Sequence, residues 1–341
     1  MTHSIDDLRM MQALPLDIKV RMTEQRIRQW VNEYGEDGVY ISFSGGKDST
    51  VLMDIARRIY PDLPAMFVNT GLEYPEVVQF VKTFINVEIL RPKMSFKQVV
   101  EKYGYPFISK EVSKHVFDTR KAGRDSMSYQ KLTGTGKYEG SEYSSPKYAQ
   151  LLDADYVIGS YCCRVMKKSP KHSYGIRTGR KNITGQMANE SRQRLSTWLR
   201  YGCNAFDQKT PTSNPMSFWT DQDVLRYIKE HHLPIASVYG DIVAVDADGY
   251  EYDSLLTETC QLKTTGCYRT GCIFCGFGAH LEKGEGRFQR LKGTHPKLYD
   301  YCMGGGAYDS DGLWKPTAQG LGMAHVIDDL CRRYGDGFIK Y

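Results

Sequence analysis

The sequence lacks any apolar run that approaches ~18 residues, the usual threshold for a membrane-spanning helix. Its opening stretch, MTHSIDDLRMMQALPLDIKV, has no basic region followed by an apolar one, so no secretory leader is expected. Strong charge of one sign is also missing, because the formal net charge is only +5 over 341 residues and does not by itself indicate a nucleic-acid-binding protein. These absences favour a cytoplasmic globular protein that does not enter a membrane.

The cysteines also argue against a framework of disulfide bonds. The nine cysteines are an odd number, two of them are adjacent, and no export signal accompanies them. Most lie in the C-terminal half, where such clustering points to thiolate ligands. Cys203 and Cys331 stand apart and are more typical of buried thiols that pack like small apolar residues.

What the sequence does contain is an alternation of strand-like and helical patterns. After a helical segment come strand-like runs at 39–44, 65–70 and 87–90, each followed by a helical pattern, at 48–60, 74–84 and 95–104. This order predicts an α/β fold with a doubly wound, mostly parallel sheet. In such a sheet, ligands bind at the carboxyl ends of the strands.

The composition suggests three consecutive parts. We expect an N-terminal helical segment over 1–35, a nucleotide-binding α/β domain over 36–250, and a Cys-rich metal-binding and C-terminal helical region over 251–341. Residues 119–149 are rich in Gly, Ser, Tyr and Lys without an apolar period, and we expect a mobile insertion there, either a lid over a nucleotide or a solvated surface loop.

The most informative stretch is the glycine-rich loop at the end of the first strand. It comprises Ser44, Gly45, Gly46, Lys47, Asp48 and Ser49. Two glycines let the backbone turn sharply and bring N–H groups close to an anion, and the helix that follows adds its positive N-terminal end. The spacing differs from the common phosphate loop G-x-x-x-x-G-K-[ST], so a different phosphate chemistry is predicted.

A second constellation is the C-x-x-C pair Cys272 and Cys275, whose sulfurs can face one metal. Two further thiolates would complete a tetrahedral or cubane site. They could come from the adjacent pair Cys162–Cys163, or from the nearby Cys260 and Cys267, which would make a local zinc site. Spacing alone does not decide between these two sets.

The loop S-G-G-K-D-S resembles that of the PP-loop ATP pyrophosphatases, and the segments FVNTGLEYPEVVQFV and PMSFWTDQDVLRYIKEHHLP resemble the phosphoadenosine phosphosulfate (PAPS) reductase branch. ITGQMANESRQR resembles a further segment of that branch, with Gly185, Ser191 and Arg194 at its matching positions. The resemblance runs from about residue 20 to 300. It implies an adenine nucleotide, either ATP or an adenylyl sulfonucleotide, bound by 44–49 with Gly185 and Ser191, and Mg²⁺ on its phosphates. It also implies catalytic roles for Lys47 and Arg194, with Glu190 as a magnesium ligand or as the partner of Arg194.

The resemblance extends to the cysteines. Iron–sulfur members of this family pair a Cys-Cys dipeptide with a later C-x-x-C around one [4Fe-4S] cluster, which implies that the ligands are Cys162, Cys163, Cys272 and Cys275. Lys167 and Pro170 match the segment after the dipeptide, with Lys167 implied as catalytic, whereas Met166 stands where the family has arginine. Cys267 or Cys302 would be a redox-active thiol near the cluster or would simply pack.

One departure from the family bears on the activity. The reductases carry a Glu-Cys-Gly-Leu-His tail whose cysteine attacks the sulfate sulfur, whereas this sequence ends VIDDLCRRYGDGFIKY. An amphipathic helix is predicted there, with Cys331 beside Leu330 in its apolar face.

Three hypotheses follow. The first is an enzyme that transfers sulfur through an adenylated intermediate with pyrophosphate release, acting on tRNA or DNA and supplied by a cysteine desulfurase or a thiol or electron donor. The second is a PAPS or adenylyl sulfate reductase that releases sulfite, and the third a non-catalytic nucleotide-sensing or assembly protein. A homodimer is a further expectation.

Overall fold

The computed structural model describes residues 3–246, 250–252 and 260–341. Residues 1–2 of the predicted helical segment, and 253–259 at the start of the predicted Cys-rich region, lie outside the described residues. The chain divides into unit 1 (Met1–Asn69, Glu73–Arg91 and Lys171–Thr270) and unit 2 (Thr70–Leu72, Pro92–Pro170 and Gly271–Tyr341). Each unit combines segments that are far apart in the sequence, and the boundaries of the three predicted parts remain a prediction.

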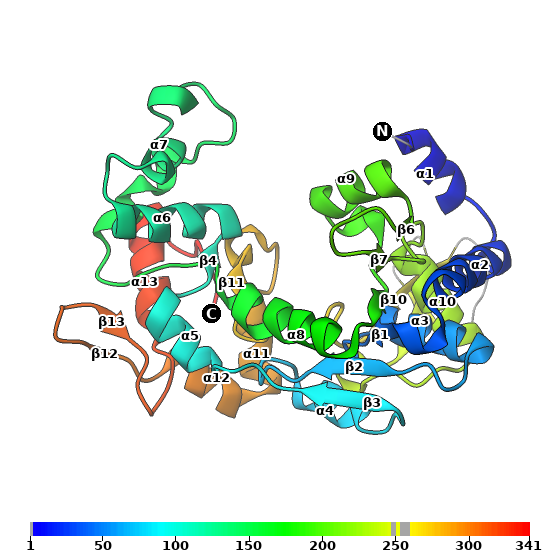
Figure 1. The fold of residues 1–341 in the computed structure, drawn as a ribbon. Coiled ribbons are helices and arrows are strands. Elements are labelled where there is room, and N and C mark those ends of the chain that lie inside the picture. Colours follow the sequence, from blue (N-terminus) through cyan, green and yellow to red (C-terminus); the bar gives the residue numbers. More distant parts are fainter. Residues whose placement is uncertain (1–2, 247–249, 253–259) are drawn as a thin grey trace. The chain divides into compact units, whose positions relative to one another are not determined.

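Unit 1 is built on a six-stranded sheet with the order β3-β2-β1-β5-β7-β6 (Figure 1). Its strands are β1 (Val39–Ser42), β2 (Ala65–Val68), β3 (Val87–Leu90), β5 (Lys181–Ile183), β6 (Asn204–Ala205) and β7 (Thr212–Ser213). All neighbouring strands are parallel except β6 and β7. The predicted mostly parallel α/β sheet is therefore confirmed. The connections leave β1 toward β2 on one side and toward β5 on the other, and a reversal of this kind is where open α/β sheets bind ligands.

The helices of unit 1 begin and end where local signals place them. They are α1 (Ile5–Gln12), α2 (Leu16–Tyr34), α3 (Lys47–Ile59), α4 (Pro75–Val81), α9 (Arg192–Tyr201) and α10 (Asp221–Glu230). The helix α2 ends before Gly35, which has φ 77°, a conformation that glycine adopts without strain. The helix α10 starts after Thr220, whose side chain accepts the N–H of Asp223 in a capping box.

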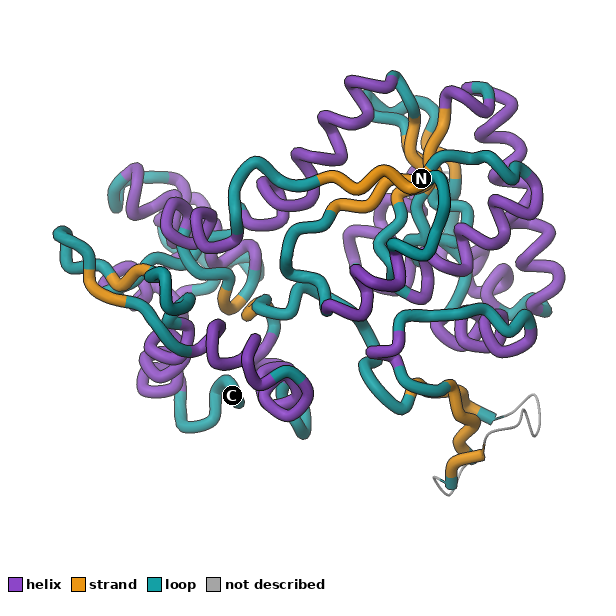
Figure 2. The backbone as a smooth tube through the Cα atoms, turned by 90° about the horizontal axis from the view of Figure 1, so that it is seen from below, coloured by secondary structure: helices purple, strands orange, loops and turns teal. Residues whose placement is uncertain are grey.

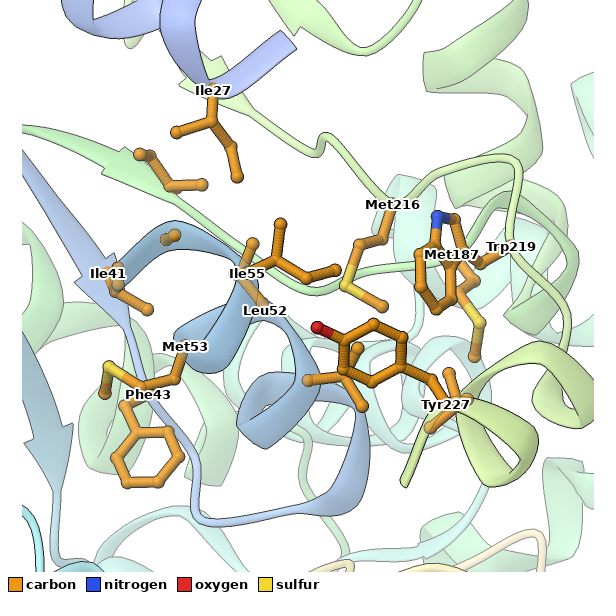
Figure 3. Packing of buried hydrophobic residues seen from close by; sticks show 14 of the residues in the cluster. Ile27, Ile41, Phe43, Leu52, Met53, Ile55, Met187, Met216, Trp219 and Tyr227 are labelled. Carbon is orange, nitrogen blue, oxygen red and sulfur yellow. The ribbon is translucent and has the colours of Figure 1, made fainter. Parts of the chain in front are cut away.

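Apolar side chains from α2, β1, α3 and α10 form the main core of unit 1 (Figure 3). Ile27, Ile41 and Leu52 are fully buried in it. Trp219 is buried as well, and its indole N–H donates to Thr23 Oγ1 at 2.9 Å. Because α3 packs against both α2 and α10, its N-terminus and the glycine-rich loop are held firmly at the carboxyl end of β1.

Unit 1 also carries a three-stranded antiparallel sheet, with the order β10-β8-β9. Its strands are β8 (Ile242–Val245), β9 (Glu251–Tyr252) and β10 (Gln261–Thr264). The segment that follows β10 leads directly to the glycine-rich loop.

Unit 2 is mostly helical and contains only short strands (Figure 2). Its elements are α5 (Phe96–Tyr103), β4 (Phe107–Ile108), α6 (Lys110–Ala122), α7 (Met127–Thr133), β11 (Gly276–Phe277), α11 (Arg287–Thr294), α12 (Pro296–Met303), β12 (Ala307–Tyr308), β13 (Trp314–Lys315) and α13 (Met323–Tyr334). The strands β4 and β11 pair in parallel. The helix α8 (Ser169–Thr178) leads the chain from unit 2 into unit 1.

The segment 119–149, which was predicted to be a mobile insertion, contains helical structure. The helix α6 extends to Ala122, and α7 begins after Ser126, whose side chain caps it by accepting the N–H of Tyr129. Leu132 of α7 and the nearby Leu151 are buried, so a few apolar positions suffice to fix the segment. Its role as a lid remains a prediction.

The predicted amphipathic helix near the C-terminus is confirmed as α13. Val326, Ile327 and Leu330 are fully buried, whereas Cys331 is half-buried and its Sγ lies 3.7 Å from the carbonyl oxygen of Ile339. Across the described residues, no helix combines the length and apolar character that a membrane crossing requires.

Candidate functional site

The glycine-rich loop forms a tight turn between β1 and α3. Gly45 has φ 70°, and the N–H of Gly46 donates to Ser44 Oγ at 3.3 Å. Ser49 accepts the N–H of Ser44 at 3.2 Å and donates its hydroxyl to the carbonyl of Gly46 at 2.9 Å. The loop is therefore closed on itself by its own hydroxyl groups, and the N-terminal end of α3 points at the anion that it is predicted to hold.

Gly185, Ser191 and Arg194 were predicted as site residues although they lie far from the glycine-rich loop in sequence. All three also belong to unit 1. A Cβ built on Gly185 would lie 2.9 Å from the carbonyl oxygen of Asp48, so only glycine lets the end of β5 approach the loop this closely. Ser191 caps α9 by accepting the N–H of Arg194 at 3.3 Å. The guanidinium of Arg194 pairs with Glu190 in this structure, and a role of Glu190 as a magnesium ligand remains a prediction.

Lys47 is enclosed rather than mobile, since its side chain is only 1% exposed. Its Nζ lies 2.6 Å from Asp48 and 3.0 Å from Asp221. Burial alone would lower the pKa of Lys47, but the two carboxylates outweigh burial and raise that pKa above its usual value. Lys47 therefore stays charged and is held at one position.

Asp221, the first residue of α10, was not predicted as a site residue. Besides Lys47 it accepts the hydroxyl of Tyr268 at 2.7 Å and lies 3.4 Å from Nη2 of Arg269. Burial would raise the pKa of Asp221, but the hydrogen bond from Tyr268 and the charge of Lys47 lower it. This carboxylate therefore joins the loop to the segment that follows β10.

That segment, Gly266–Thr270, is attached to the loop at one further point, through Tyr239. The N–H of Lys47 donates to the hydroxyl of Tyr239 at 3.1 Å, and this hydroxyl shares a 2.8 Å hydrogen bond with Thr270 Oγ1. Arg269 also lies 3.6 Å from Glu190. Neither Asp221 nor Arg269 was predicted as a site residue. Arg269 lies between Cys267 and Cys272, whose thiols are the more prominent pattern there, and Asp221 is an acid in the first turn of a helix.

Substituting Gly45 with alanine is expected to destabilise the loop. The added Cβ would lie 2.6 Å from Val81 Cγ2 and 2.7 Å from Val77 Cγ1, at a φ that alanine disfavours. Overpacking of this kind costs about 1–3 kcal/mol. Urea unfolding of Gly45→Ala should show that loss. Gly71→Ala also places alanine at positive φ, but its added Cβ would meet no atom within 4 Å, so it should show only the smaller cost of the backbone conformation. Equal losses in the two variants would mean that the contacts with α4 do not matter.

The pH dependence of stability should reveal Asp221. Its pKa is lowered on folding, so the stability that its charge contributes is complete above about pH 5 and is lost as the pH falls through the lowered value. We expect Asp221→Asn to be less stable than the wild type by about 1–2 kcal/mol at pH 7. The difference should shrink below about pH 4 in denaturant titrations, since the wild-type carboxyl is then protonated. A difference that stays constant down to pH 3 would contradict the ionised pairing.

The four cysteines of the predicted cluster all belong to unit 2. Cys272 and Cys275 lie in one turn, in which the N–H of Cys275 donates to the carbonyl of Cys272 at 3.1 Å. The pairing of β11 with β4 brings this turn to the start of α6, where Lys110 lies. Cys162 and Cys163 precede a π-helical turn, Arg164–Lys168, in the same unit.

The thiols of the dipeptide differ in acidity. A hydrogen bond from Cys162 lowers the pKa of Cys163 to about 6, against the effect of burial. The same hydrogen bond raises the pKa of Cys162, and nearby Cys275 and Cys272 add to the rise. The basic side chains that favour the Cys163 thiolate are Lys110, Lys167 and Lys168. Lys167 is thus a neighbour of the cysteines, and its predicted catalytic role remains a prediction.

The remaining cysteines have other surroundings. Cys302 is fully buried with its thiol 3.4 Å from Met323 Sδ, and burial raises its pKa, so it packs rather than reacts. Cys267 donates to the carbonyl of Arg269 at 2.9 Å, and Cys260 packs against the core of unit 1. Within the part of the chain that the structure describes, no three His, Cys, Asp or Glu side chains are grouped as they would be around a single metal ion.

Relatives of this chain include several enzymes of one kind. A phosphoadenosine 5'-phosphosulfate reductase of Xylella fastidiosa is 24% identical over 235 residues, which cover 67% of this chain and 77% of that protein. One from Xanthomonas campestris pv. campestris is 26% identical over 242 residues, covering 68% and 76%. An uncharacterized protein of Methanocaldococcus jannaschii is 41% identical over only 70 residues, 19% of this chain and 17% of that protein.

Solved structures were compared as well. A phosphoadenylyl-sulfate reductase from Candida auris, in a phosphate complex, aligns with a TM-score of 0.38 at 14% identity and covers 70% of this chain and 91% of its own. An FMN adenylyltransferase of Candida glabrata with ATP gives 0.39 at 10% identity and covers 69% and 65%. The fold assignment rests on the strand order of unit 1 and not on these alignments.

A family model decides the relationship. The model described as the phosphoadenosine phosphosulfate reductase domain matches residues 38–141 and 119–276, which include the glycine-rich loop, Arg194 and the C-x-x-C turn. The match spans well over half of the chain, and the chain belongs to the phosphoadenosine phosphosulfate reductase domain family.

Proposed function

We propose that this protein binds an adenylyl sulfonucleotide at the glycine-rich loop and reduces it, releasing sulfite. The observation that carries the proposal is the family match across the loop together with the charged groups around it. Lys47 is buried, charged and fixed beside the turn, and Arg194 lies at the start of α9. A phosphosulfate needs such preorganised cations because negative charge accumulates on its oxygens as the sulfur–oxygen bond breaks.

The reaction is a two-electron reduction. The bond between the sulfate sulfur and the bridging phosphate oxygen breaks, adenosine phosphate keeps that oxygen, and the sulfur leaves as sulfite. Two thiols supply the electrons and form one disulfide. In this proposal Lys47 and Arg194 bind the phosphate and sulfate oxygens, and the N–H groups of Gly45 and Gly46 line the turn that receives them.

We further propose that Cys162, Cys163, Cys272 and Cys275 hold a [4Fe-4S] cluster. The chemistry of the donor set supports this, because Cys162 lies near enough to Cys163, Cys275 and Cys272 for their charges to raise its pKa, and Lys110 lies near both Cys163 and Cys275. The same thiolates could instead hold a single zinc ion, which is the alternative that the experiments on the cysteines test. When bound, the cluster would supply a charged redox-active centre beside these residues.

A second candidate is sulfur transfer from an ATP-activated intermediate, with pyrophosphate release. Three carboxylates close to the loop favour it, namely those of Asp48, Asp221 and Glu190. Carboxylates of this kind suit Mg²⁺ bound to phosphate oxygens. An acceptor such as tRNA or DNA and a cysteine desulfurase belong to this candidate alone.

One assay separates the candidates. Anaerobically purified protein is incubated with adenylyl sulfate or its 3'-phosphate form and a dithiol, and separately with ATP and Mg²⁺. Sulfite that forms in step with disulfide supports the reductase, and pyrophosphate from ATP supports sulfur transfer. Neither product, with nucleotide binding intact, would contradict both and leave a non-catalytic binding protein.

A further inference from the structure

The charged groups around the loop form a balanced set in unit 1. Lys47 pairs with Asp48 and Asp221, and Arg194 pairs with Glu190. A third cation, Arg269, lies between the two groups, 3.4 Å from Asp221 and 3.6 Å from Glu190. Three cations therefore face three carboxylates. Arg269 shares Asp221 with Lys47 and Glu190 with Arg194, and these two cations are the ones predicted to act on the nucleotide.

Arg269 is held in this position from both sides. Tyr268, before it, donates to Asp221 at 2.7 Å, and the Tyr268 ring has Lys47 Nζ 5.7 Å from its centre on one side and the Arg269 guanidinium at 5.6 Å. Thr270, after it, is hydrogen-bonded to Tyr239, which also accepts the N–H of Lys47. The approach is close, since a Cβ on Gly46 would lie 3.5 Å from Thr270 Oγ1.

Arg269 remains accessible to a ligand, because its side chain is 47% exposed. It lies close enough to Arg194 for its charge, after burial, to lower the pKa of that residue. Two guanidinium groups brought together against a single carboxylate repel each other, and a second anion between them relieves the repulsion. Arginine can move its planar fork of donors from a carboxylate to phosphate or sulfate oxygens without losing hydrogen bonds.

We infer that Arg269 is a third cationic ligand of the nucleotide's anionic group, and that Asp221 and Glu190 hold its place until that anion binds. The inference rests on the proposed function, because it assigns a further ligand to the same site. The incoming phosphate or sulfate oxygens take over Arg269 from the carboxylates, and Lys47 and Arg194 bind the remaining oxygens. Asp221 competes with the substrate for two of the three cations.

The test is equilibrium binding of adenylyl sulfate and of ATP to the full chain. Arg269→Gln should weaken binding of the nucleotide that the wild type binds by about ten- to a hundredfold, the scale of a lost charged hydrogen bond. Arg269→Lys, which keeps the charge but not the fork, should fall between Arg269→Gln and the wild type. The matched control is Arg192→Gln, because Arg192 is an exposed arginine in the first turn of α9, and this variant should bind within about twofold of the wild type.

Repeating the measurement in the Asp221→Asn variant tests whether Arg269 acts only through Asp221. If Arg269 acted only by holding Asp221, its substitution would have no effect once Asp221 is Asn. We expect Arg269→Gln to weaken binding at least about tenfold in the Asp221→Asn background as well. Binding by Arg269→Gln within twofold of its parent in either background would overturn the inference. A wild-type protein that binds neither nucleotide would instead contradict the proposed function itself.

Discussion

Replacing Lys47 with methionine should nearly abolish nucleotide binding and turnover. The lysine is 1% exposed and is fixed by Asp48 and Asp221, so methionine keeps the packing volume but leaves two carboxylates facing an incoming anion. The lost charged hydrogen bonds alone are worth about 1.5–3 kcal/mol, or about ten- to 150-fold in the dissociation constant. Turnover should fall by a further factor of about 10²–10³, because a preorganised charge near the reacting bond is removed.

Isothermal titration with adenylyl sulfate and with ATP measures the first effect, and single-turnover kinetics at saturating nucleotide the second. Lys82→Met is the matched control, since Lys82 is exposed at the end of α4 and its loss removes the same charge from unit 1. Stability should be followed in parallel, because unpaired carboxylates also weaken folding. If Lys47→Met binds nucleotide as tightly as Lys82→Met, the glycine-rich loop is not the anion site.

The sheet and the loop were predictable because their signals are local. Ser44–Ser49 contain both glycines and the helix start, and the buried strand before them and the buried helix after them fix where that turn lies. Gly185 and Ser191 followed from the family resemblance, and the structure brings Gly185 against Asp48 and places Ser191 at the start of α9. Short motifs with one fixed backbone role are what a sequence can reveal.

Short motifs could not reveal Asp221, the distant partner of Lys47. Asp221 is 174 residues away from it in sequence, and its helix position explains an acid there without any contact with the loop. Arg269 stands between cysteines whose own spacing attracts the interpretation. Long-range ion pairs depend on how separate elements pack, and the pattern of one strand or helix does not contain that information.

The helix α7 was not predicted either, although the signals for it are local. A low apolar content suggested a loop, yet the Ser126 cap and the buried Leu132 are enough to form the helix once the rest of unit 2 packs against it. Helices in proteins gain most of their stability from tertiary packing, so composition underestimates short ones.

Replacing a single ligand of the proposed cluster is expected to abolish cluster binding completely. Anaerobically purified protein should be brown and contain iron and acid-labile sulfide, and Cys272→Ser should lose both because a cubane needs all of its thiolates. Cys163→Ser should behave in the same way, since that thiol is the one that Lys110, Lys167 and Lys168 help to ionise. Iron and sulfide assays with the visible spectrum measure the effect.

Two further variants make this test specific. Cys331→Ser should keep the iron, because its half-buried Sγ lies 3.7 Å from the Ile339 carbonyl oxygen and contacts no other cysteine. Cys260→Ser distinguishes the two ligand sets: it should keep the metal if Cys162 and Cys163 complete the site, and lose it if the site is the local one with Cys260 and Cys267. A colourless wild-type protein with one zinc ion, lost on Cys260→Ser, would refute the cluster.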